Sequence, residues 1–422
     1  MSRDALITAI DVGSSKVCAL IAEVEREGRT RVVGVGVVPS RGMRRGVVVN
    51  VEQAVEAIAA AIAKAERTCG AKITAARVTV GGNHISALSN RGVVGVSHPD
   101  RTIRQADVQL ALEQARVVSL PGDRQIIHIL PRAFLVDGQE GVHNPAGMVG
   151  YRLEVDTHIV TGGTTVIQNL TQCLRRAGVE VESLVFAPLA DAAAVLSEEE
   201  KEMGVALVDI GGGTTNLAVF TEGSVSYTGV LGLGGGHVSN DIAVGLCTPL
   251  GSAEELKLAH GHALAGAVDE RETVHVPTFG AESEEVSRRR LVEIMEARLE
   301  EICGLVAAEL GRTGYSGVLP AGVVLTGGTA ETPGIEDLAR EVFGLPVRVG
   351  RPRGVAGLDD ITRGPAYAAA VGLLLWGART GAGAGAVDGT RAGQRGGRLG
   401  EQPAQAAGVF GRLVGWLRSF LP

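Results

Sequence analysis

Apolar runs separated by short glycine-rich turns organise this chain. An apolar run over residues 205–208 leads into Asp209, three glycines and two threonines, and apolar alternation then resumes over 215–221. This pattern is typical of two strands joined by a tight turn. A further turn at residues 222–223 and a third strand over 224–230 complete the unit.

The same unit occurs near the N-terminus. An apolar run over residues 6–10 leads to Asp11, a turn follows at 13–15, and strands are predicted over 18–22 and 32–38. Two copies of one strand–turn–strand–strand unit predict a duplicated α/β fold. In such a fold, the two turns that carry aspartate are expected to face each other across a cleft.

Apolar residues at helical spacing mark further elements. Spacings of three and four over Val51–Cys69 predict an amphipathic helix that Gly70 ends. A similar stripe predicts a long helix over 284–310, and the stripe is interpreted as core. Two alanine-rich segments, 189–196 and 364–372, predict crossing helices that pack closely and form a hinge.

Between the two copies the pattern changes to short strands at 85–88, 93–96, 125–135 and 151–159, with a helix capped by Thr102. This predicts a small inserted α+β unit. The expected divisions are a first lobe at 1–82 with about 160–196 and 364–377, the insert at 83–159, a second lobe at 197–231 with about 313–363, its outer part at 232–312, a linker at 378–407 and a terminal helix at 408–422.

Both turns have a composition suited to phosphate. Glycines let backbone N–H groups approach an anion closely, and serine or threonine adds hydroxyl donors. Aspartate at the end of each first strand is suited to orienting the waters of Mg²⁺. A glycine-rich hairpin that binds nothing is the alternative. The candidate phosphate and Mg²⁺ residues are Asp11, Gly13, Ser14, Ser15, Lys16, Asp209, Gly211, Gly212, Gly213, Thr214 and Thr215, with the two aspartates serving the metal.

A third glycine turn follows the apolar run at 323–326. Gly327 and Gly328 end this predicted strand, and a helix is expected from Thr332-Pro333. A turn without side chains lets a flat base and ribose lie against the backbone. These two glycines are therefore candidates for contact with a nucleoside.

Charge and composition narrow the class of protein. The formal net charge of −7 argues against a nucleic-acid binder. Five scattered cysteines without CxxC spacing support neither a disulfide framework nor a zinc site. No signal peptide is expected, and the apolar stretch at 366–376 is shorter than the about 20 residues that span a bilayer. We expect a cytosolic protein.

The end of the chain differs from the rest. From 378 onward six arginines accompany two acids, and a glycine-rich linker precedes a short amphipathic pattern. Large apolar residues, two arginines and no acid in the last helix are typical of an in-plane membrane anchor for anionic lipid. Docking of this tail on the protein's own body or on a partner is the alternative. The candidate membrane residues are Val409, Phe410, Arg412, Leu413, Trp416, Leu417, Arg418 and Phe420.

The two aspartate hairpins and the late Thr-Gly-Gly turn together resemble the actin, Hsp70 and sugar-kinase superfamily, with its duplicated RNase H-like fold of two lobes around a nucleotide cleft. Within it, the chain is similar to the FtsA family of actin-like bacterial cell-division proteins. The stretches that carry this resemblance are 39–49, 91–94, 128–132, 147–148, 152–155, 158–161 and 236–243.

The resemblance implies ATP and Mg²⁺ as ligands, with Glu254 and Lys257 at the adenosine; a solvated ion pair three residues apart on a helix is the alternative for these two. It implies self-association into filaments through the insert, binding of the C-terminal tail of FtsZ, the tubulin-like ring protein, and contact with other division proteins. Arg288, Arg289 and Arg290 are candidate FtsZ contacts, with a solvated basic turn as the alternative. The location implied is the cytoplasmic face of the cell membrane at the division septum.

Hydrolysis of ATP would depend on residues of the first crossing helix. Relatives in the superfamily often carry Glu before the Pro-Leu-Ala of the first crossing helix, whereas Ala187 stands here. Asp191 is the candidate catalytic residue. Asn216 replaces an aspartate that FtsA sequences commonly have. We therefore expect ATP to act mainly as a conformational and polymerisation ligand, with slow hydrolysis at most.

Other functions of this superfamily are alternatives. An actin-like component of type IV pilus assembly accounts less well for residues 236–242 and for the tail. A small-molecule kinase needs a substrate pocket with a catalytic aspartate, which the sequence does not identify. An Hsp70-like chaperone needs a substrate domain after residue 377, where the remaining chain is too short and glycine-rich.

Overall fold

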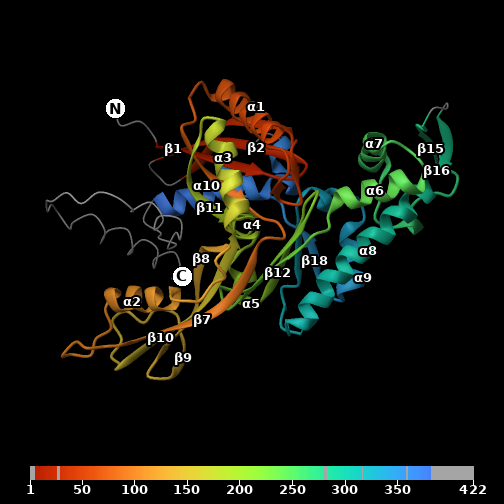
Figure 1. Cartoon of the computed structure of the whole chain (residues 1–422). Helices are drawn as coiled ribbons and strands as arrows, with labels where there is room; N and C mark the ends of the chain where they lie inside the picture. The colour runs from red at the N-terminus through yellow and green to blue at the C-terminus, as the bar shows by residue number, and fades with distance from the viewer. Residues whose placement is uncertain (1–4, 26–28, 280–282, 316, 358–359, 382–422) are drawn as a thin grey trace.

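A computed structural model describes residues 5–25, 29–279, 283–315, 317–357 and 360–381. Its strands form three larger sheets, each covered by helices, and two short hairpins (Figure 1). We call the six-stranded sheet with its helices lobe 1, the five-stranded sheet with its helices lobe 2, and the four-stranded sheet with its helix the insert. Among the described residues, no helix is long and apolar enough to cross a membrane.

The lobe 1 sheet has the order β11-β6-β1-β2-β3-β19. Helix α1 packs on β2 and β3 and also contacts α3, whereas α10 lies against β1, β2 and β6. The strands are β1 (Ala5–Val12), β2 (Lys16–Val24), β3 (Thr30–Pro39), β6 (Ala75–Val80), β11 (Glu180–Phe186) and β19 (Val355–Ala356), and the helices are α1 (Val51–Cys69), α3 (Thr164–Arg176), α4 (Ala187–Val195) and α10 (Ala368–Gly381).

The lobe 2 sheet has the order β14-β13-β12-β17-β18. Helices α6 to α9 and the β15–β16 hairpin extend away from lobe 1 (Figure 1). The strands are β12 (Val205–Ile210), β13 (Thr215–Thr221), β14 (Ser224–Leu231), β15 (Thr273–Val276), β16 (Glu284–Ser287), β17 (Val323–Thr326) and β18 (Val347–Val349), and the helices are α5 (Glu198–Met203), α6 (Gly235–Gly245), α7 (Leu250–His260), α8 (Arg288–Arg312) and α9 (Ile335–Phe343).

The two lobes repeat one topology. In lobe 1 the first two hairpin pairings are antiparallel, β3 with β2 and β2 with β1, and β6 and β11 then add in parallel. In lobe 2 the strands β14, β13, β12, β17 and β18 have the same order and directions. The predicted duplicated α/β fold is therefore confirmed.

The insert is a sheet of order β7-β10-β8-β9 with α2 on one face, below lobe 1 in Figure 1. Its elements are β7 (Ser86–Gly95), β8 (Arg124–Val136), β9 (Gln139–Val142), β10 (Arg152–Gly163) and α2 (Gln105–Arg116). Two short strands were expected in place of β7, but the backbone is continuous, because β10 pairs with it from Arg152–Gly95 to Thr161–Ser86.

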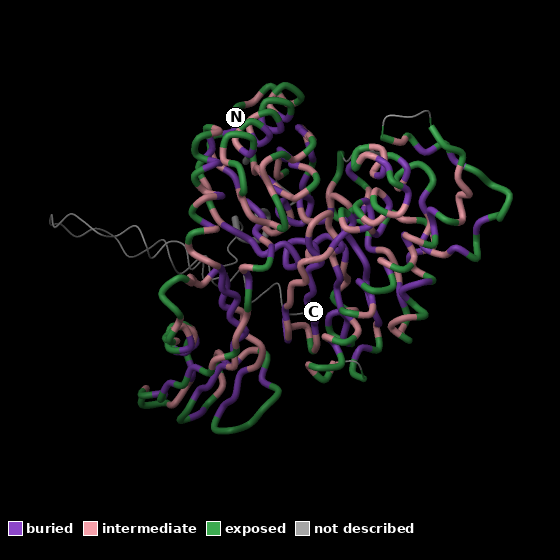
Figure 2. Tube along the Cα trace, turned by 45° about the vertical axis from the view of Figure 1, so that its right-hand side comes forward, coloured by how far each residue is buried: buried purple, intermediate pink, exposed green. Residues whose placement is uncertain are grey.

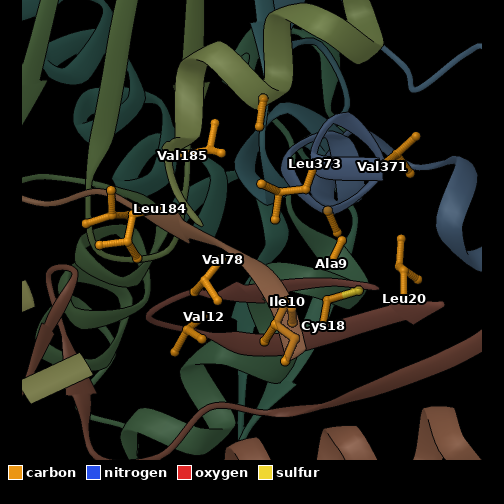
Figure 3. Close-up of a cluster of buried hydrophobic side chains, with 14 of the residues drawn as sticks. Ala9, Ile10, Val12, Cys18, Leu20, Val78, Leu184, Val185, Val371 and Leu373 are labelled. Atoms are coloured by element: carbon orange, nitrogen blue, oxygen red, sulfur yellow. The ribbon is translucent and has the colours of Figure 1, made fainter. Parts of the chain in front are cut away.

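The cores are built mainly from aliphatic residues. Figure 3 shows side chains of β1, β2, β6, β11 and α10 meeting in lobe 1. Helix α4 contacts α10 as well as β12 and β13 of lobe 2, so the buried residues of the lobe 1 core, drawn in purple in Figure 2, continue into lobe 2. Lobe 2 has a second core, to which α8 contributes the predicted apolar stripe of Leu291, Met295, Leu299, Ile302, Val306 and Leu310, all buried.

The crossing helices pack as closely as their alanines and glycines suggested. A Cβ on Gly372 of α10 would overlap the carbonyl of Ala190 in α4, so glycine is required there. Helix α4 begins at Ala187, earlier than predicted. The segment before α10 forms a short 3-10 turn at Pro365–Tyr367, and α10 continues to Gly381.

Three helix starts differ from expectation. Arg104 rather than Thr102 precedes α2, and its backbone N–H donates a hydrogen bond to the Asp107 carboxylate. Helix α8 begins at Arg288 because residues 284–287 pair with β15 as a strand. Helix α7 begins at Leu250 after Pro249, whereas the sequence pattern predicts a helix capped by Ser252.

Candidate functional site

The two glycine-rich hairpins have the same local geometry. In the first, the N–H of Gly13 donates to the carbonyl of Lys16 at 3.0 Å, and in the second the N–H of Gly211 donates to the carbonyl of Thr214 at 2.9 Å. Each turn therefore closes in the same way after its aspartate. We call the turns of residues 13–15 and 211–214 the first and second phosphate hairpins.

The hairpins lie against each other across the lobes. A Cβ on Gly213 would lie 2.9 Å from the Cβ of Ser14, and a Cβ on Gly212 would meet the hydroxyl of Ser15. Glycine is needed at both positions because the opposite hairpin approaches so closely. The predicted arrangement of facing turns is found in the structure.

A cavity of about 400 Å³ opens between the lobes beside these hairpins. Its walls come from both hairpins, from α4, α6 and α7, and from the turn after β17. Of the candidate residues for phosphate, metal, adenosine and catalysis, those that line it are Asp11, Gly13, Ser14, Ser15, Lys16, Asp191, Asp209, Gly211, Gly212, Gly213, Thr214, Glu254, Lys257, Gly327 and Gly328. The structure therefore brings residues far apart in sequence into one cavity.

Thr215 does not line this cavity. Its side chain is fully buried, and its hydroxyl donates to the carbonyl of Leu233 at 2.9 Å. This bond fixes the second phosphate hairpin to the segment before α6. The neighbouring Asn216 lines the cavity instead.

Three carboxylates converge on the cavity. Asp11 accepts a hydrogen bond from the hydroxyl of Thr79 at 2.6 Å, and Asp209 accepts one from the side-chain amide of Asn216 at 2.8 Å. Burial raises the pKa of Asp11, and burial, with the charge of Asp11, raises the pKa of Asp209 to about 6. These carboxylates hold protons more readily than exposed ones.

Asp191 is the most deeply placed of the three. Its side chain is 1% exposed, and burial followed by the charges of Asp209 and Asp11 raises its pKa well above the usual value. Its Oδ2 and the Oδ1 of Asn216 are buried without a hydrogen-bond partner among the described residues. Because an unpaired buried acceptor is costly, these oxygens mark a place for a donor that the protein does not supply.

Lys16 follows the first phosphate hairpin and reaches the segment before α10. Its ammonium donates to the carbonyl of Ala366 and lies 4.4 Å from the centroid of the Tyr367 ring. These contacts join the hairpin to the segment before α10. Its positive charge lowers the pKa of each of the three cavity carboxylates and so opposes the effect of burial.

Glu254 and Lys257 lie on one face of α7, where their side chains form an ion pair at 2.7 Å. The ammonium also donates to the hydroxyl of Ser239 at 2.9 Å and to the carbonyl of Gly235 at 3.2 Å. With its side chain only 15% exposed, this lysine belongs to a network at the cavity wall rather than to a solvated pair.

Gly327 needs its glycine for two reasons. Its φ of 85° favours glycine, and a Cβ there would collide with the carboxylate of Asp209. Sequence reasoning missed Thr79 and Ser239, which hold Asp11 and Lys257. Their only sequence signals are that Thr79 lies near the end of a strand before two glycines and that Ser239 lies one helical turn after the opening of α6.

The other candidates lie outside this cavity. Arg288 and Arg289 pair with Glu272 and Glu270, whereas Arg290 is exposed, and its one hydrogen bond to another described residue is to the carbonyl of Gly245 at 3.4 Å. They form the first turn of α8, within the helix predicted over 284–310. The candidate membrane residues at 409–420 lie outside the described part of the chain.

Comparison with known proteins assigns the family. A model of "Cell division protein FtsA" matches residues 206–372, and one of the "SHS2 domain inserted in FTSA" matches 82–161. The cell division protein FtsA of Pseudomonas aeruginosa is 46% identical over 373 residues, covering 88% of this chain and 89% of that protein. FtsA of Bacillus subtilis is 38% identical, with 90% and 85% covered.

Solved structures agree on the fold. The PilM-PilN type IV pilus biogenesis complex aligns with a TM-score of 0.63 at 18% identity, covering 89% of this chain and 98% of that one. MreB5 of Spiroplasma citri bound to ADP aligns with a TM-score of 0.51 at 14% identity, covering 87% and 95%. Such low identities establish an actin-like fold only. With the matches to cell division proteins over most of its length, the chain belongs to the FtsA family of actin-like cell division proteins.

Proposed function

We propose that this cell division protein binds ATP with Mg²⁺ in the cavity between lobe 1 and lobe 2. The observation that carries the proposal is the pair of opposed phosphate hairpins with the buried, unpartnered oxygens of Asp191 and Asn216 beside them. Backbone N–H groups and hydroxyls suit an anionic phosphate chain. Unpaired carboxylate and amide oxygens suit the waters of a hydrated cation.

The donor set fits Mg²⁺ held through water. No group of three or more His, Cys, Asp or Glu side chains in the described ranges is close enough to hold a metal by itself. Asp11 and Asp209 are each bonded through one carboxylate oxygen to a neighbour. Their other oxygens would accept hydrogen bonds from metal-bound waters, and the cation would neutralise charge on the phosphates.

Each group of the remaining residues would bind a different part of the ATP molecule. Ser14, Ser15, Thr214 and the glycines of both phosphate hairpins would bind phosphate oxygens. The Lys16 ammonium, which bonds to the carbonyl of Ala366, would turn to the phosphates as their cation. Glu254 and Lys257 on α7 would bind the ribose and base, which would lie against Gly327 and Gly328. This division follows the cavity from the hairpins to the turn after β17.

Hydrolysis would depend on Asp191. Ala187 offers no polar group, whereas Asp191 has a free oxygen in the cavity wall. Its raised pKa makes it a proton acceptor only when a cation offsets the neighbouring carboxylates. We therefore propose slow turnover, with Asp191→Asn expected to abolish it while leaving ATP binding within about threefold of the wild type.

Calorimetric titration of the full chain with Mg-ATP tests the binding site. Asp11→Asn is expected to weaken binding at least about tenfold, because the waters of the cation lose a negatively charged hydrogen-bond acceptor. The matched control is Asp337→Asn, which removes an exposed acid paired with Arg340 on α9. Equal affinity in wild type and Asp11→Asn, or no binding by the wild type, would contradict the proposal.

The cell-division role is proposed to work through polymerisation at the cytoplasmic face of the membrane. Filaments of this chain would present many copies of the basic, apolar C-terminal segment to anionic lipid, so that weak contacts add up. The outer part of lobe 2 would receive the C-terminal tail of FtsZ and so hold the FtsZ ring at the septum, with other division proteins as further partners. Family membership supports a role in cell division rather than in pilus assembly, because the pilus complex resembles this chain only in its fold.

A further inference from the structure

A short hairpin of lobe 1 closes the phosphate end of the cavity. Strands β4 (Met43–Arg44) and β5 (Val47–Val48) carry Arg45 and Gly46 at their tip. The N–H of Gly46 donates to the Ser14 hydroxyl at 3.2 Å, and a Cβ on Gly213 would lie 3.1 Å from the backbone nitrogen of Arg45. The tip thus contacts both phosphate hairpins at once.

The backbone at this tip is tightly held. Arg45 has a φ of 49°, which is uncommon for a residue with a side chain, and Gly46 follows with a φ of 77°. A Cβ on Gly82 would lie 2.7 Å from the Arg45 carbonyl, so the tip also packs on the turn after β6. The guanidinium therefore extends from a fixed backbone next to Gly46, which lines the cavity.

The guanidinium reaches lobe 2. Its Nη2 lies 3.1 Å from Nε2 of His237. The backbone N–H of Gly234 donates to Nδ1 of this histidine at 3.1 Å, which leaves the ring proton on Nε2, facing the guanidinium. The pair joins the hairpin tip of lobe 1 to the first turn of α6, which begins beside the second phosphate hairpin.

A neutral imidazole is a weak partner for a guanidinium compared with an oxyanion, which can accept two charge-assisted hydrogen bonds. Within the described ranges no carboxylate pairs with Arg45. The cavity itself contains the carboxylates of Asp11, Asp191 and Asp209 and needs cations to hold a phosphate chain. Arg45 is a cation beside the phosphate hairpins whose present partner is easily displaced.

We propose that Arg45 is an oxyanion-binding residue of this cavity: a terminal phosphoryl group, on a nucleoside triphosphate or free as orthophosphate, takes its guanidinium from His237. The hairpin tip then closes over the phosphate and senses whether the terminal phosphate is present. The inference rests on the proposed nucleotide binding and adds to it a residue that distinguishes triphosphate from diphosphate.

The test is calorimetric titration of the full chain with Mg-ATP and Mg-ADP, and of the Mg-ADP-loaded chain with orthophosphate. Arg45→Gly removes the guanidinium and relieves the left-handed backbone, so it should fold; Arg45→Lys keeps the charge without the bidentate geometry. The matched control is Arg44→Ala, from an exposed position on the same hairpin.

Arg45→Gly is expected to weaken Mg-ATP binding at least about tenfold and Mg-ADP binding less than about twofold. Arg45→Lys should lie between, and Arg44→Ala should match the wild type. If the wild-type Mg-ADP form binds orthophosphate and Arg45→Gly does not, free phosphate is also a ligand of Arg45. If the variant weakens only the binding of Mg-ATP, the site is specific for the triphosphate.

Equal weakening of Mg-ATP and Mg-ADP in Arg45→Gly, or no weakening of either, would overturn the inference while leaving the nucleotide site intact. Failure of the wild-type chain to bind either nucleotide would overturn the nucleotide site and this inference together.

Discussion

Gly213 and Ser14 pack so closely across the cleft that a Cβ on the glycine would lie 2.9 Å from the serine Cβ. The same Cβ would lie 3.1 Å from the backbone nitrogen of Arg45. Rotation of the serine hydroxyl relieves neither contact, because the positions of the Ser14 Cβ and the Arg45 nitrogen are fixed by the backbone. The two lobes can therefore adopt this closed arrangement only with glycine at position 213.

Gly213→Ala should hold the lobes apart and weaken Mg-ATP binding by at least about tenfold, with the fold retained. Gly304→Ala in α8, where a Cβ meets nothing within 4 Å, is the control and should leave binding unchanged. Titration calorimetry and far-ultraviolet circular dichroism measure the two properties. Full affinity in Gly213→Ala would show that the cleft does not need this approach.

Asp209→Asn should stabilise the nucleotide-free protein at neutral pH. The pKa of Asp209 is raised from 3.8 to about 6, so its contribution to folding is complete below pH 3.8 and is lost as pH rises through about 6. Asparagine avoids this loss and should raise the free energy of unfolding at pH 7 by roughly 2 kcal/mol, with little difference at pH 4.

Urea unfolding at the two pH values measures this difference, with the exposed Asp337→Asn as control. In the presence of Mg-ATP the wild type should be more stable than Asp209→Asn, because the variant lacks the negative charge that helps to hold the cation. A variant less stable than the wild type at pH 7 without nucleotide would contradict the account.

The insert is joined to lobe 2 by a buried histidine. Nε2 of His158 on β10 lies 2.9 Å from the Thr228 hydroxyl on β14, and burial, with the charge of Arg132, lowers the pKa of the ring to about 4. The unfolded chain takes up a proton near pH 6.5, so this histidine stabilises the fold above that pH and the contribution is lost as pH falls towards 4.

His158→Gln keeps a hydrogen-bonding group but does not titrate. The loss of unfolding free energy between pH 7 and pH 5 should therefore be smaller in the variant by roughly 2 kcal/mol. His143→Gln, at an exposed position, is the control and should follow the wild type. Parallel pH dependence in all three proteins would refute the role given to His158.

Arg290 is the most available of the three arginines at the start of α8. Arg288 and Arg289 are held by Glu272 and Glu270, so their charges are partly offset. Arg290→Glu should weaken binding of an FtsZ C-terminal peptide about tenfold, and Arg289→Glu less, because among the described residues Arg290 pairs with no carboxylate, whereas Arg289 pairs with Glu270. Fluorescence anisotropy of a labelled peptide measures both; equal affinity in both variants and the wild type would place the peptide elsewhere.

Local patterns in the sequence predict much of this fold. The Asp-Gly hairpins at Asp11 and Asp209 could be recognised because strand alternation stops at a glycine turn in each copy. The stripe from Leu291 to Leu310 predicts the buried face of α8 for the same kind of reason. Both patterns depend on residues close in sequence, and both are confirmed.

Long-range contacts could not be predicted in this way. Residues 284–287 carry a helical pattern but form β16, because β15 offers a partner strand. Thr79 bonds to Asp11 across 68 positions, and Arg45 meets His237 across 192. Nothing in the local sequence of Thr79 or Arg45 indicates these partners, since only the packing of the sheets brings them together.

Co-sedimentation with lipid vesicles tests the central claim, that ATP-dependent polymerisation tethers this protein to the membrane. The full chain and a truncation after Gly381, which keeps all of α10, would be compared on anionic and neutral vesicles with Mg-ATP and with Mg²⁺ alone. The account predicts that only the full chain pellets, preferentially on anionic lipid and more with Mg-ATP. Equal pelleting of the truncation, or no pelleting of the full chain in any condition, would contradict it.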